Sequence, residues 1–388
     1  MTATPQVDFI VVGAGIAGAS AAAELAAHGR VVVLEAESHP GYHTTGRSAA
    51  LFSESYGNAV VRALSRASRA FLHEPPAGFA AAPLVRPRGT MLLVNHGQQG
   101  LAERLREDPD ILACTTLLDA DAALARVPIL RREPLAGAVL DATSADIDVD
   151  LLLQGFLRQA RERGARLHLD CAVTGLERHG SNWRARTRAG DFEAPVIVNA
   201  AGAWADAVGA MAGARAMRLQ SLRRTAALVD VPQGADASKW PLVMAIDESF
   251  YFKPDAGLLL ISPADETPSA PCDAQPEELD VAIAVDRFET ATGLPVRQVR
   301  RRWAGLRVFS PDRTPVIGFD PEVPGFFWCA GQGGYGIQTA PCLARVAASL
   351  ARREPMPEDV AALGVTAAQL SPRRFAPADV RRATAGDA

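Results

Sequence analysis

Short apolar runs that stop at glycine or charged residues recur along this chain and predict the strands of a sheet. Phe9–Val12 precedes an Ala-rich stretch at 19–27, Val31–Leu34 stops at Glu35, and 196–198 leads into small residues. Apolar runs of this length, alternating with stretches of helical spacing, are typical of buried strands in βαβ units. We also expect helices from residue 59, from the segment 145–150, and over 337–350.

The pattern changes after residue 219, where short apolar strands are separated by Pro- and Gly-containing loops. The predicted strands cover 225–229, 250–252, 258–261 and 299–303. Such spacing is typical of antiparallel strands in an open sheet. Residues 100–134, in contrast, are charged and predicted to be helical. The chain therefore combines βαβ units with a second, mostly antiparallel region.

Three glycines, Gly13, Gly15 and Gly18, lie between the first predicted strand and the first predicted helix. In this spacing Gly13 permits a tight turn, Gly15 lets a pyrophosphate approach the backbone, and Gly18 allows close packing of helix on strand. The free N–H groups of the helix N-terminus then face the anion. Glu35, at the end of the next strand, is placed to bind a ribose hydroxyl. These features predict a dinucleotide site; a ligand-free Ala/Gly-rich hairpin is the alternative.

Composition narrows the classes of function. The chain has 388 residues, 48% hydrophobic and 22% charged, which fits a globular protein of more than one domain. Its net charge of -4 provides no basic surface for nucleic acid. Its five cysteines include no C-x-x-C pair, so we expect neither a metal site nor disulfides, and a cytoplasmic location. We expect no transmembrane segment; loose association with a membrane surface stays open.

Three later segments are predicted to return to the same nucleotide crevice. The polar loop at 40–50 offers hydroxyl and guanidinium groups for a pyrophosphate or flavin edge, from Thr44, Thr45, Arg47 and Ser48, and small side chains for a flat ring, from Ala49 and Ala50. A glycine turn follows the strand at 196–198, and another at 331–336 opens the last long helix, whose N-terminal dipole would face the ligand. Surface loops that only reverse the chain are the alternative.

Two arginines, Arg224 and Arg307, each lie close to one end of a predicted strand. Two guanidinium groups that converge on one place suit a carboxylate, which they can bind through paired hydrogen bonds. The run at 300–302 shows that surface arginines are also common in this region. Either arginine taken alone is therefore more typical of a solvated surface position than of a binding site.

Four motifs together resemble the D-amino-acid-oxidase-like FAD enzymes, and the likeness runs nearly end to end. They are the glycine turn at 13–18 and the segments 198–204, 303–307 and 333–336. Within that family the chain is most similar to the bacterial D-arginine dehydrogenases, through 41–50, 247–251 and 336–339. The resemblance implies noncovalent FAD, oxidation of a D-amino acid to an imino acid that hydrolyses to a 2-oxo acid, and an electron acceptor that is a quinone, another carrier or oxygen.

The resemblance and the pattern together predict an α/β fold of two domains, a Rossmann-like FAD-binding domain and a substrate domain with a mixed, mostly antiparallel β-sheet. We expect the FAD-binding domain to be discontinuous and to comprise 1–80, 140–215 and 309–375. The substrate domain would comprise 81–139 and 216–308. The tail at 376–388 is expected to be disordered.

The family resemblance also implies roles for individual residues. Arg224 and Arg307 would hold the substrate carboxylate, Tyr56 and Tyr251 would add hydrogen bonds, and the Gly334 carbonyl would accept from the amine, so that hydride passes from Cα to flavin N5. We expect FAD to be bound by Gly13, Gly15, Ile16, Ala17, Gly18, Glu35, Ala36, Thr44, Thr45, Arg47, Ser48, Ala49, Ala50, Val173, Ala201, Gly202, Trp204, Gly305, Arg307, Gly333, Gly334, Tyr335, Gly336, Ile337 and Gln338.

The chain departs from the D-arginine dehydrogenases where the substrate side chain would lie. Thr90 stands where they have an acidic residue, and Leu51 where they have a histidine. Without the carboxylate, a cationic substrate loses a hydrogen bond to a charged group, about 1.5–3 kcal/mol. We therefore expect a pocket of Leu51, Thr90, Leu242 and Met244 for an apolar or small side chain. Because Arg86 and Arg88 lie close to Thr90 in the sequence, an acidic substrate remains an alternative.

Other functions share parts of this pattern. Oxidation of a 2-hydroxy acid or of a secondary amine would use the same arginines and is the main alternative. A nicotinamide dehydrogenase would need the first glycine turn but not the two later ones. A flavin-binding protein without catalysis would retain the cofactor residues alone.

Overall fold

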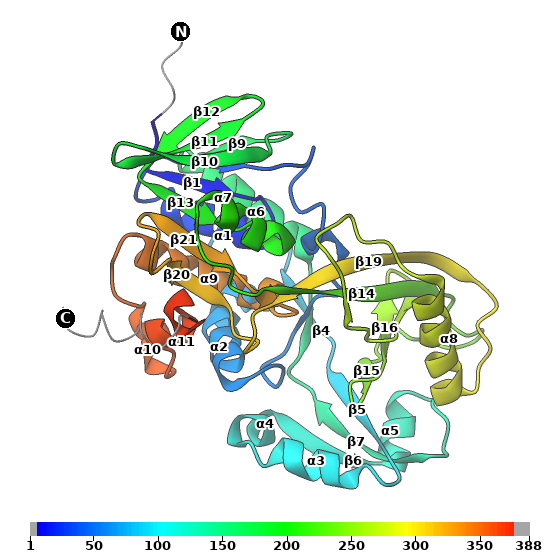
Figure 1. Ribbon diagram of the computed structural model, residues 1–388. Coiled ribbons are helices and arrows are strands. Elements are labelled where there is room, and N and C mark those ends of the chain that lie inside the picture. The colour runs from blue at the N-terminus through cyan, green and yellow to red at the C-terminus, as the bar shows by residue number, and fades with distance from the viewer. Residues whose placement is uncertain (1–5, 376–388) are drawn as a thin grey trace.

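A six-stranded sheet forms the upper half of the molecule in Figure 1 and carries the first glycine turn. The computed structural model describes residues 6–375, so the predicted tail at 376–388 lies outside the described residues. The strand order is β20 (Val316–Phe319), β21 (Phe326–Ala330), β13 (Val196–Asn199), β1 (Phe9–Val12), β2 (Val31–Leu34) and β9 (Arg166–His168). All neighbours are parallel except β20 and β21, so the predicted βαβ units are present.

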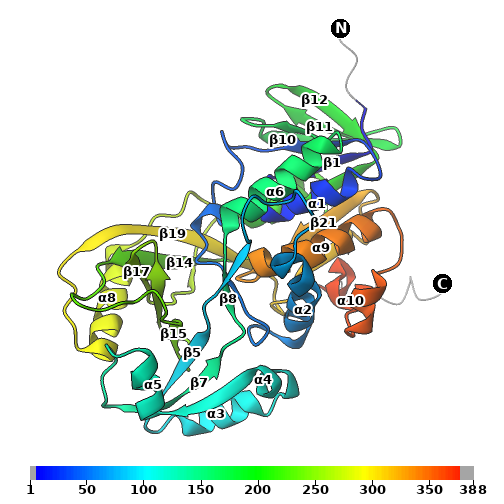
Figure 2. The same cartoon turned by 180° about the vertical axis from the view of Figure 1, so that it is seen from behind.

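Both faces of this sheet are covered, as the continuous apolar strands require. Alternate residues Val11 and Val33 pack toward α1 (Ile16–Leu25), α6 (Val149–Glu162) and α9 (Gly336–Ala351), which lie in front of the sheet in Figure 2. Ile10 and Val32 pack on the opposite side, against α7 (Ala205–Met211) and a small sheet of β10 (Val173–His179), β11 (Asn182–Thr187) and β12 (Gly190–Ala194). Beside α9 lies α2 (Ala59–His73), with α10 (Glu358–Ala362) next to α2 (Figure 2). Helix α11 (Ala367–Leu370) packs against β20.

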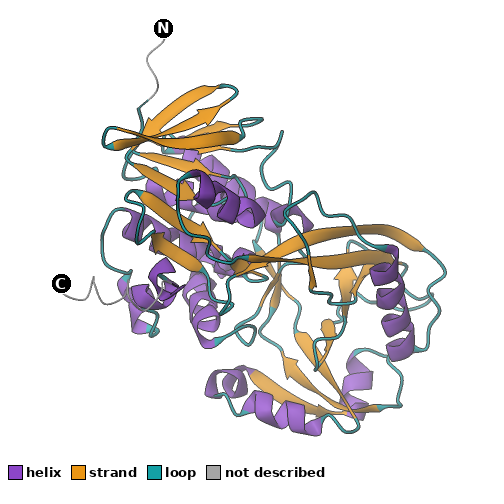
Figure 3. Cartoon of the chain, viewed as in Figure 1, coloured by secondary structure: helices purple, strands orange, loops and turns teal. Residues whose placement is uncertain are grey.

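A larger, mostly antiparallel sheet forms the lower half, with helices on its outer side (Figure 3). Its order is β22 (Gln332–Gly333), β19 (Val299–Phe309), β14 (Gln220–Val229), β17 (Leu258–Ser262), β16 (Tyr251–Asp255), β15 (Leu242–Ala245), β5 (Thr90–Asn95), β7 (Leu135–Asp141) and β6 (Thr115–Asp119), with β18 (Thr267–Pro268) beside β14. Only β15 and β5 are parallel neighbours in it. The predicted α/β fold class, with a mixed and mostly antiparallel second sheet, is confirmed.

The larger sheet has one face toward helices and one toward the six-stranded sheet. Helices α8 (Glu278–Thr292) and α5 (Ala120–Arg126) pack on the first face, and α3 (Gln99–Arg106) and α4 (Pro109–Cys114) lie near its end. The second face is partly covered by a three-stranded sheet of β3 (Leu51–Phe52), β8 (Ala145–Ile147) and β4 (Val85–Pro87).

Three parts of the secondary structure differ from the prediction. Residues 145–147, expected to begin a helix, form β8, and the helix begins at Val149. The region after residue 219 contains α8, whose buried Val281, Ala284 and Phe288 have helical spacing that the short apolar runs around them concealed. Residues 100–134 contain β6, which pairs with β7 although Leu117 is exposed. Short edge strands carry few apolar residues, so their partner, not their own sequence, determines them. The predicted domain boundaries remain our proposal; β22 belongs to the larger sheet although it lies within 309–375.

The first glycine turn is the tightest contact between helix and sheet in the upper half. A Cβ on Gly18 would lie 1.9 Å from the carbonyl oxygen of Gly13, which is backbone and has no freedom to move aside. Gly13 itself has φ +100° and its Cβ position lies 2.6 Å from the Ala200 oxygen. The turn therefore depends on the absence of side chains at both positions.

We expect the Gly18→Ala substitution to lower the free energy of unfolding by about 3 kcal/mol, because the added methyl forces α1 away from β1. Gly100→Ala is a matched control, since its Cβ would meet only the flexible end of Arg104 at 3.5 Å. That control should change stability by about 1 kcal/mol or less. Urea unfolding followed by circular dichroism measures both, and equal stability of the two variants would contradict the packing argument.

Candidate active site and cofactor pocket

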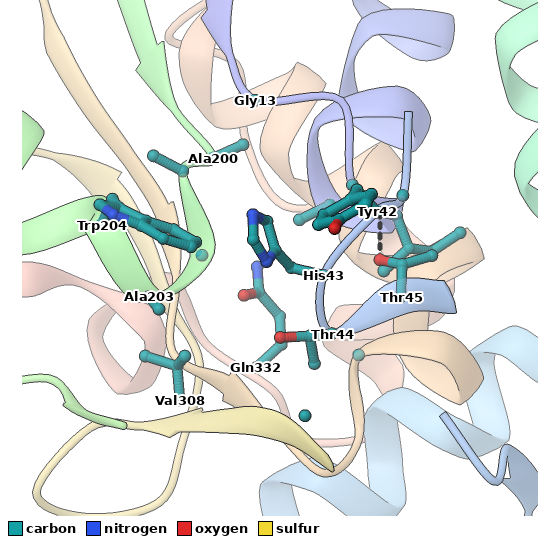
Figure 4. Close-up of a pocket in the computed structure, with 18 of the residues that line it drawn as sticks. Gly13, Tyr42, His43, Thr44, Thr45, Ala200, Ala203, Trp204, Val308 and Gln332 are labelled. Carbon is teal, nitrogen blue, oxygen red and sulfur yellow. Dashed lines mark hydrogen bonds between the residues drawn. The ribbon is translucent and has the colours of Figure 1, made fainter. Parts of the chain in front are cut away.

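A pocket of about 450 Å³ opens at the carboxyl ends of β1, β2 and β13, where ligands bind in open α/β sheets. It extends from there to β14 and β19 of the larger sheet. Of the residues predicted to bind FAD, those lining it are Gly13, Gly15, Ile16, Ala17, Glu35, Ala36, Thr44, Thr45, Arg47, Ser48, Ala49, Val173, Ala201, Gly202, Trp204, Gly305, Arg307, Gly333, Gly334, Gly336 and Ile337. Segments that lie far apart in the sequence thus form one pocket (Figure 4).

The start of α1 gives the pocket its anion-binding end. Gly15 precedes the helix in an extended conformation, and no acidic residue lies in the first turn. The Ile16 amide donates to the Thr45 hydroxyl oxygen at 3.0 Å, drawn as the dashed line in Figure 4. Because the first amides of a helix lack partners within it, they can bind a pyrophosphate.

The carboxylate of Glu35 lies at the end of β2 and holds two backbone amides. It accepts from Ala14 at 2.6 Å and from Glu37 at 3.0 Å. These bonds fix the carboxylate beside the glycine turn, where its remaining lone pairs can accept from a ribose hydroxyl. The structure thus places Glu35 where the sequence spacing predicted it.

The polar loop at 40–50 lines the pocket, but several of its polar groups already have partners in the protein. The Arg47 guanidinium donates to the carbonyl oxygens of Ala274 at 2.8 Å and Ala304 at 3.1 Å, and it pairs with Asp273. The Thr44 hydroxyl donates to the Leu306 oxygen at 2.6 Å. These contacts tie the loop to the larger sheet, so the loop also joins the two halves of the site.

Sequence reasoning missed four polar or aromatic pocket residues, Glu37, Tyr42, His43 and Gln332. The His43 ring lies between Tyr42 and Trp204 in Figure 4, with ring centres 4.9 Å and 4.6 Å away. Its Nε2 pairs with Glu37 at 2.9 Å. Tyr42 and His43 belong to the loop already singled out, so their position was the available signal; Gln332 adjoins the third glycine turn.

Arg224 and Arg307 lie on the same face of the β14–β19 pair. Arg224 is opposite Gly305 in the register, two residues before Arg307 on the same strand. Such diagonal neighbours are within reach of long side chains. Both arginines line the pocket, together with Tyr251 from β16 and Gly334. The two arginines, separated by 83 positions in the sequence, are therefore brought together as predicted for a carboxylate clamp.

The clamp concentrates two positive charges in a largely enclosed place. Burial lowers the pKa of Arg224, and the charge of Arg307 lowers it further. Burial acts against the charge of Arg307 as well, but Tyr56, Tyr251 and Glu266 together outweigh it and raise the pKa of Arg307. The Arg307 Nη1 is buried and has no hydrogen-bond partner within residues 6–375. A buried donor of this kind indicates a partner that the chain does not supply.

Several predicted site residues lie just behind the pocket wall. Gly18 supports the glycine turn, Ala50 holds the backbone of Ile147 through its oxygen, and the Gln338 side chain binds the Ser53 amide and the Ser65 hydroxyl. Tyr335 packs against Tyr56, with ring centres 5.1 Å apart. None of these five predicted residues is in the pocket lining, so each would act through a neighbour.

The predicted substrate side-chain residues form an apolar cluster next to the clamp. Leu51, Leu242 and Met244 pack with Tyr251 and Ala226. Tyr251 and Ala226 also line the pocket. Thr90 is buried, and its hydroxyl is 2.8 Å from the Ser144 hydroxyl. The four residues do not line the pocket in this conformation, but three of them adjoin its wall.

Arg86 and Arg88, which left an acidic substrate as an alternative, have different surroundings. Arg88 donates to Asp146 at 2.6 Å and to the backbone oxygens of Ser238 and Trp240, each at 3.0 Å. Arg86 is exposed. Arg88 is thus hydrogen-bonded within the protein, but it shares the Asp146 carboxylate with Lys253, whose Nζ is 2.7 Å from Oδ1.

The pocket fits FAD on its own features. It combines a helix N-terminus whose turn excludes Cβ atoms, a fixed carboxylate for the ribose, and small residues against which a flat ring can lie. The described residues contain no cluster of side chains arranged to hold a metal ion. Within residues 6–375, no helix has both the length and the apolar character needed to cross a membrane.

Comparison with known proteins agrees with this geometry. Residues 8–350 match the family model described as FAD dependent oxidoreductase. Glycine oxidase from Geobacillus kaustophilus is 26% identical, over 94% of this chain and 97% of its own. The hydrogen cyanide synthase subunit HcnC from Pseudomonas aeruginosa is 25% identical, over 91% of this chain and 94% of its own.

Solved structures show the same fold. The glycine oxidase from Geobacillus kaustophilus gives a TM-score of 0.82 at 23% identity, covering 96% of this chain and all of that one (100%). L-proline dehydrogenase from P. horikoshii gives 0.81 at 21% identity, covering 96% and 98%. The closer likeness to D-arginine dehydrogenases stays a prediction. With a family match across most of its length, the chain belongs to the DAO family of FAD-dependent oxidoreductases.

Proposed function

We propose that this enzyme oxidises a D-amino acid with an apolar or small side chain to the imino acid, which water hydrolyses to the 2-oxo acid. The observation that carries the proposal is the pair of enclosed guanidinium groups at Arg224 and Arg307, one with a buried, unpartnered donor among the described residues. Like charges held this close need an anion, and a carboxylate matches two guanidinium groups in shape and charge.

The residues of the clamp hold the substrate in one orientation. Arg224 and Arg307 bind the carboxylate, Tyr251 donates a hydrogen bond from its phenol, and the Gly334 carbonyl accepts from the amine. Tyr56, which lies behind the pocket wall, acts through Arg307. FAD, when bound, supplies the oxidant that takes a hydride from the α-carbon. Fixing the carboxylate and the amine together leaves the α-carbon only one face to present, which is how positioning contributes to the rate.

The side chain of the substrate would extend toward Leu51, Leu242 and Met244. These residues form an apolar surface with Ala226 beside Tyr251. Transfer of a charged group to such a surface is costly without a partner, whereas each buried methylene contributes about 0.8 kcal/mol. We therefore place arginine outside the preferred substrates.

The relatives support an amino-acid-like substrate and also favour a second candidate. Glycine oxidase and L-proline dehydrogenase both carry amino acids in their names, and proline is a secondary amine. Oxidation of a secondary amine by the same clamp is therefore our second candidate. The D configuration rests on the resemblance to D-arginine dehydrogenases. A quinone, another carrier or oxygen would reoxidise the cofactor, and we keep a cytoplasmic location as part of the proposal.

A substrate panel tests the proposal directly. The purified, FAD-loaded protein is mixed anaerobically with D-amino acids, their L-enantiomers, N-methyl amino acids, L-proline and 2-hydroxy acids, and bleaching of the flavin absorbance is followed. We expect apolar or small D-amino acids to bleach it fastest. Bleaching by L-proline or N-methyl amino acids alone would establish the second candidate, and no bleaching by any compound would refute both.

We expect Arg307→Lys to raise the KM of the best amino acid by about 10- to 100-fold, because lysine cannot form the paired hydrogen bonds of a guanidinium. Arg301→Lys is a matched control, since Arg301 is exposed on the same strand. Steady-state kinetics of both variants provides the measurement. Unchanged kinetics of the Arg307 variant would remove this residue from the site.

We expect Gly334→Val to abolish retention of FAD, because a Cβ at this position already lies 3.1 Å from Arg307 Nη1 and 3.3 Å from its Cζ. The two further methyl groups would push the glycine turn or Arg307 into the pocket. The ratio of flavin to protein absorbance after purification measures retention. Gly175→Val on β10, whose nearest neighbour is Arg186 Cδ at 3.9 Å, is the control. A fully flavinated Gly334 variant with an unchanged spectrum would contradict the prediction.

We expect kcat/KM to rise with pH and then level off. Arginine stays protonated over the pH range in which the ammonium group of the substrate titrates, so the clamp keeps its charge. The substrate enters as an ammonium ion, however, and only its neutral amine has the lone pair needed to form the imine as the α-hydrogen leaves. Activity should therefore follow deprotonation of the ammonium group. Rates measured across that titration provide the check, and a flat profile would count against the proposed chemistry.

A further inference from the structure

Two acidic residues just beyond β17 contact the carboxylate clamp from outside the pocket. The Nε of Arg224 donates to the backbone oxygen of Asp265 at 2.7 Å, and its Nη2 donates to Glu266 Oε1 at 3.3 Å. Neither acidic residue lines the pocket. One edge of the Arg224 guanidinium is therefore held by the protein before any substrate arrives.

We propose that Glu266 is a positioning residue for substrate binding, which fixes the outer edge of Arg224 so that its Nη1 edge faces the substrate carboxylate. A guanidinium group is planar and has five N–H donors in a fixed fork, so fixing one edge fixes the direction of the others. This inference rests on the proposed function, because it assigns Arg224 to the carboxylate of the substrate.

Glu266 is itself held in place, as a positioning residue needs to be. Its two carboxylate oxygens accept from the Nη1 and Nη2 groups of Arg313, the first at 3.2 Å. Arg313 in turn lies over the Phe309 ring, with its Cζ 4.4 Å from the ring centre. The hydrogen bonds from Arg313 lower the pKa of Glu266, so it remains a carboxylate at neutral pH. A chain of three charged groups thus runs from the surface to the clamp.

The backbone before Glu266 adopts a conformation that supports this contact. Ala264 has φ +53°, in the left-handed region that alanine rarely enters. Its amide donates to the Ser262 hydroxyl oxygen at 3.1 Å, and Asp265 Oδ1 accepts from the Thr225 amide at 2.6 Å. The turn carries both the Asp265 carbonyl and the Glu266 side chain to Arg224.

The neighbouring arginine provides an internal comparison. Arg223 lies on the same strand, one residue earlier and therefore on the opposite face. It pairs with Glu277 and Asp280 on the side of α8, and it does not line the pocket. A variant of Glu277 thus removes an ion pair of the same kind from the same strand without touching the clamp.

The test uses the FAD-loaded protein and two measurements. The first is the Kd of pyruvate, a 2-oxo acid that the enzyme cannot oxidise, from the change in flavin absorbance. The second is KM and kcat for the best substrate of the panel. We expect Glu266→Ala to raise KM and Kd about tenfold, because Arg224 loses the partner that fixes its outer edge, and to leave kcat within about twofold. A tenfold rise in Kd corresponds to a loss of about 1.4 kcal/mol of binding free energy.

Three further variants separate positioning from stability. Glu266→Gln should restore Kd to within about threefold of the wild type, because the amide oxygen still accepts from Arg224. Arg313→Gln, which removes the anchor of Glu266, should shift Kd in the same direction as Glu266→Ala but less. Glu277→Ala should leave both constants unchanged. Thermal unfolding of each variant reports any loss of fold separately.

Unchanged Kd in Glu266→Ala, an equal shift in Glu277→Ala, or tighter binding of pyruvate without the carboxylate would each overturn the inference. The last result would mean that Glu266 competes with the substrate for Arg224. Failure of the proposed function is distinguishable, because the wild-type protein itself would then neither oxidise an amino acid nor bind pyruvate.

Discussion

The enclosed pair of like charges at Arg224 and Arg307 is the constraint on which the arrangement of this molecule depends. Removing an ion from water costs several kcal/mol, and two cations side by side also repel each other. The structure meets this cost with Glu266 and the Asp265 carbonyl on one arginine and with neighbouring phenols on the other. The Arg307 donor that has no partner among the described residues favours an anionic ligand. The same two positive charges thus make the clamp costly to bury and selective for an anion.

The long strands β14 and β19 carry this clamp to the cofactor. They extend from the larger sheet to the glycine turns of the six-stranded sheet, and β22 continues the larger sheet at Gln332–Gly333. Gly305 illustrates how close the two halves come, because its Cβ would lie 3.2 Å from Arg47 Cβ. Small residues at this junction let the substrate and the cofactor occupy one pocket, which neither sheet forms alone.

Sequence reasoning placed residues correctly where their position follows from local spacing or a motif, and it missed those whose position depends on distant contacts. The glycine turn at 13–18, the strand ends and Glu35 follow from short-range rules, and the structure brings Arg224 and Arg307 together as the motifs suggested. Glu266 had no such signal, since its partner on β14 is 42 positions away and its loop has no regular pattern. Helix α8 was missed for a related reason, because its apolar face is defined by the sheet that it covers.

The clamp and the side-chain pocket are built from separate segments, which explains how one fold can serve different substrates. In the proposed function the carboxylate is held from two adjacent strands whose register fixes the geometry, so changes there would disrupt every substrate alike. Leu51, Thr90 and Met244 come from β3, β5 and β15, three short strands with different neighbours. Replacing one of them alters the shape or charge available to a side chain and leaves the clamp intact. Relatives with different substrates can therefore share the fold, and under the proposed function these few positions would select the substrate.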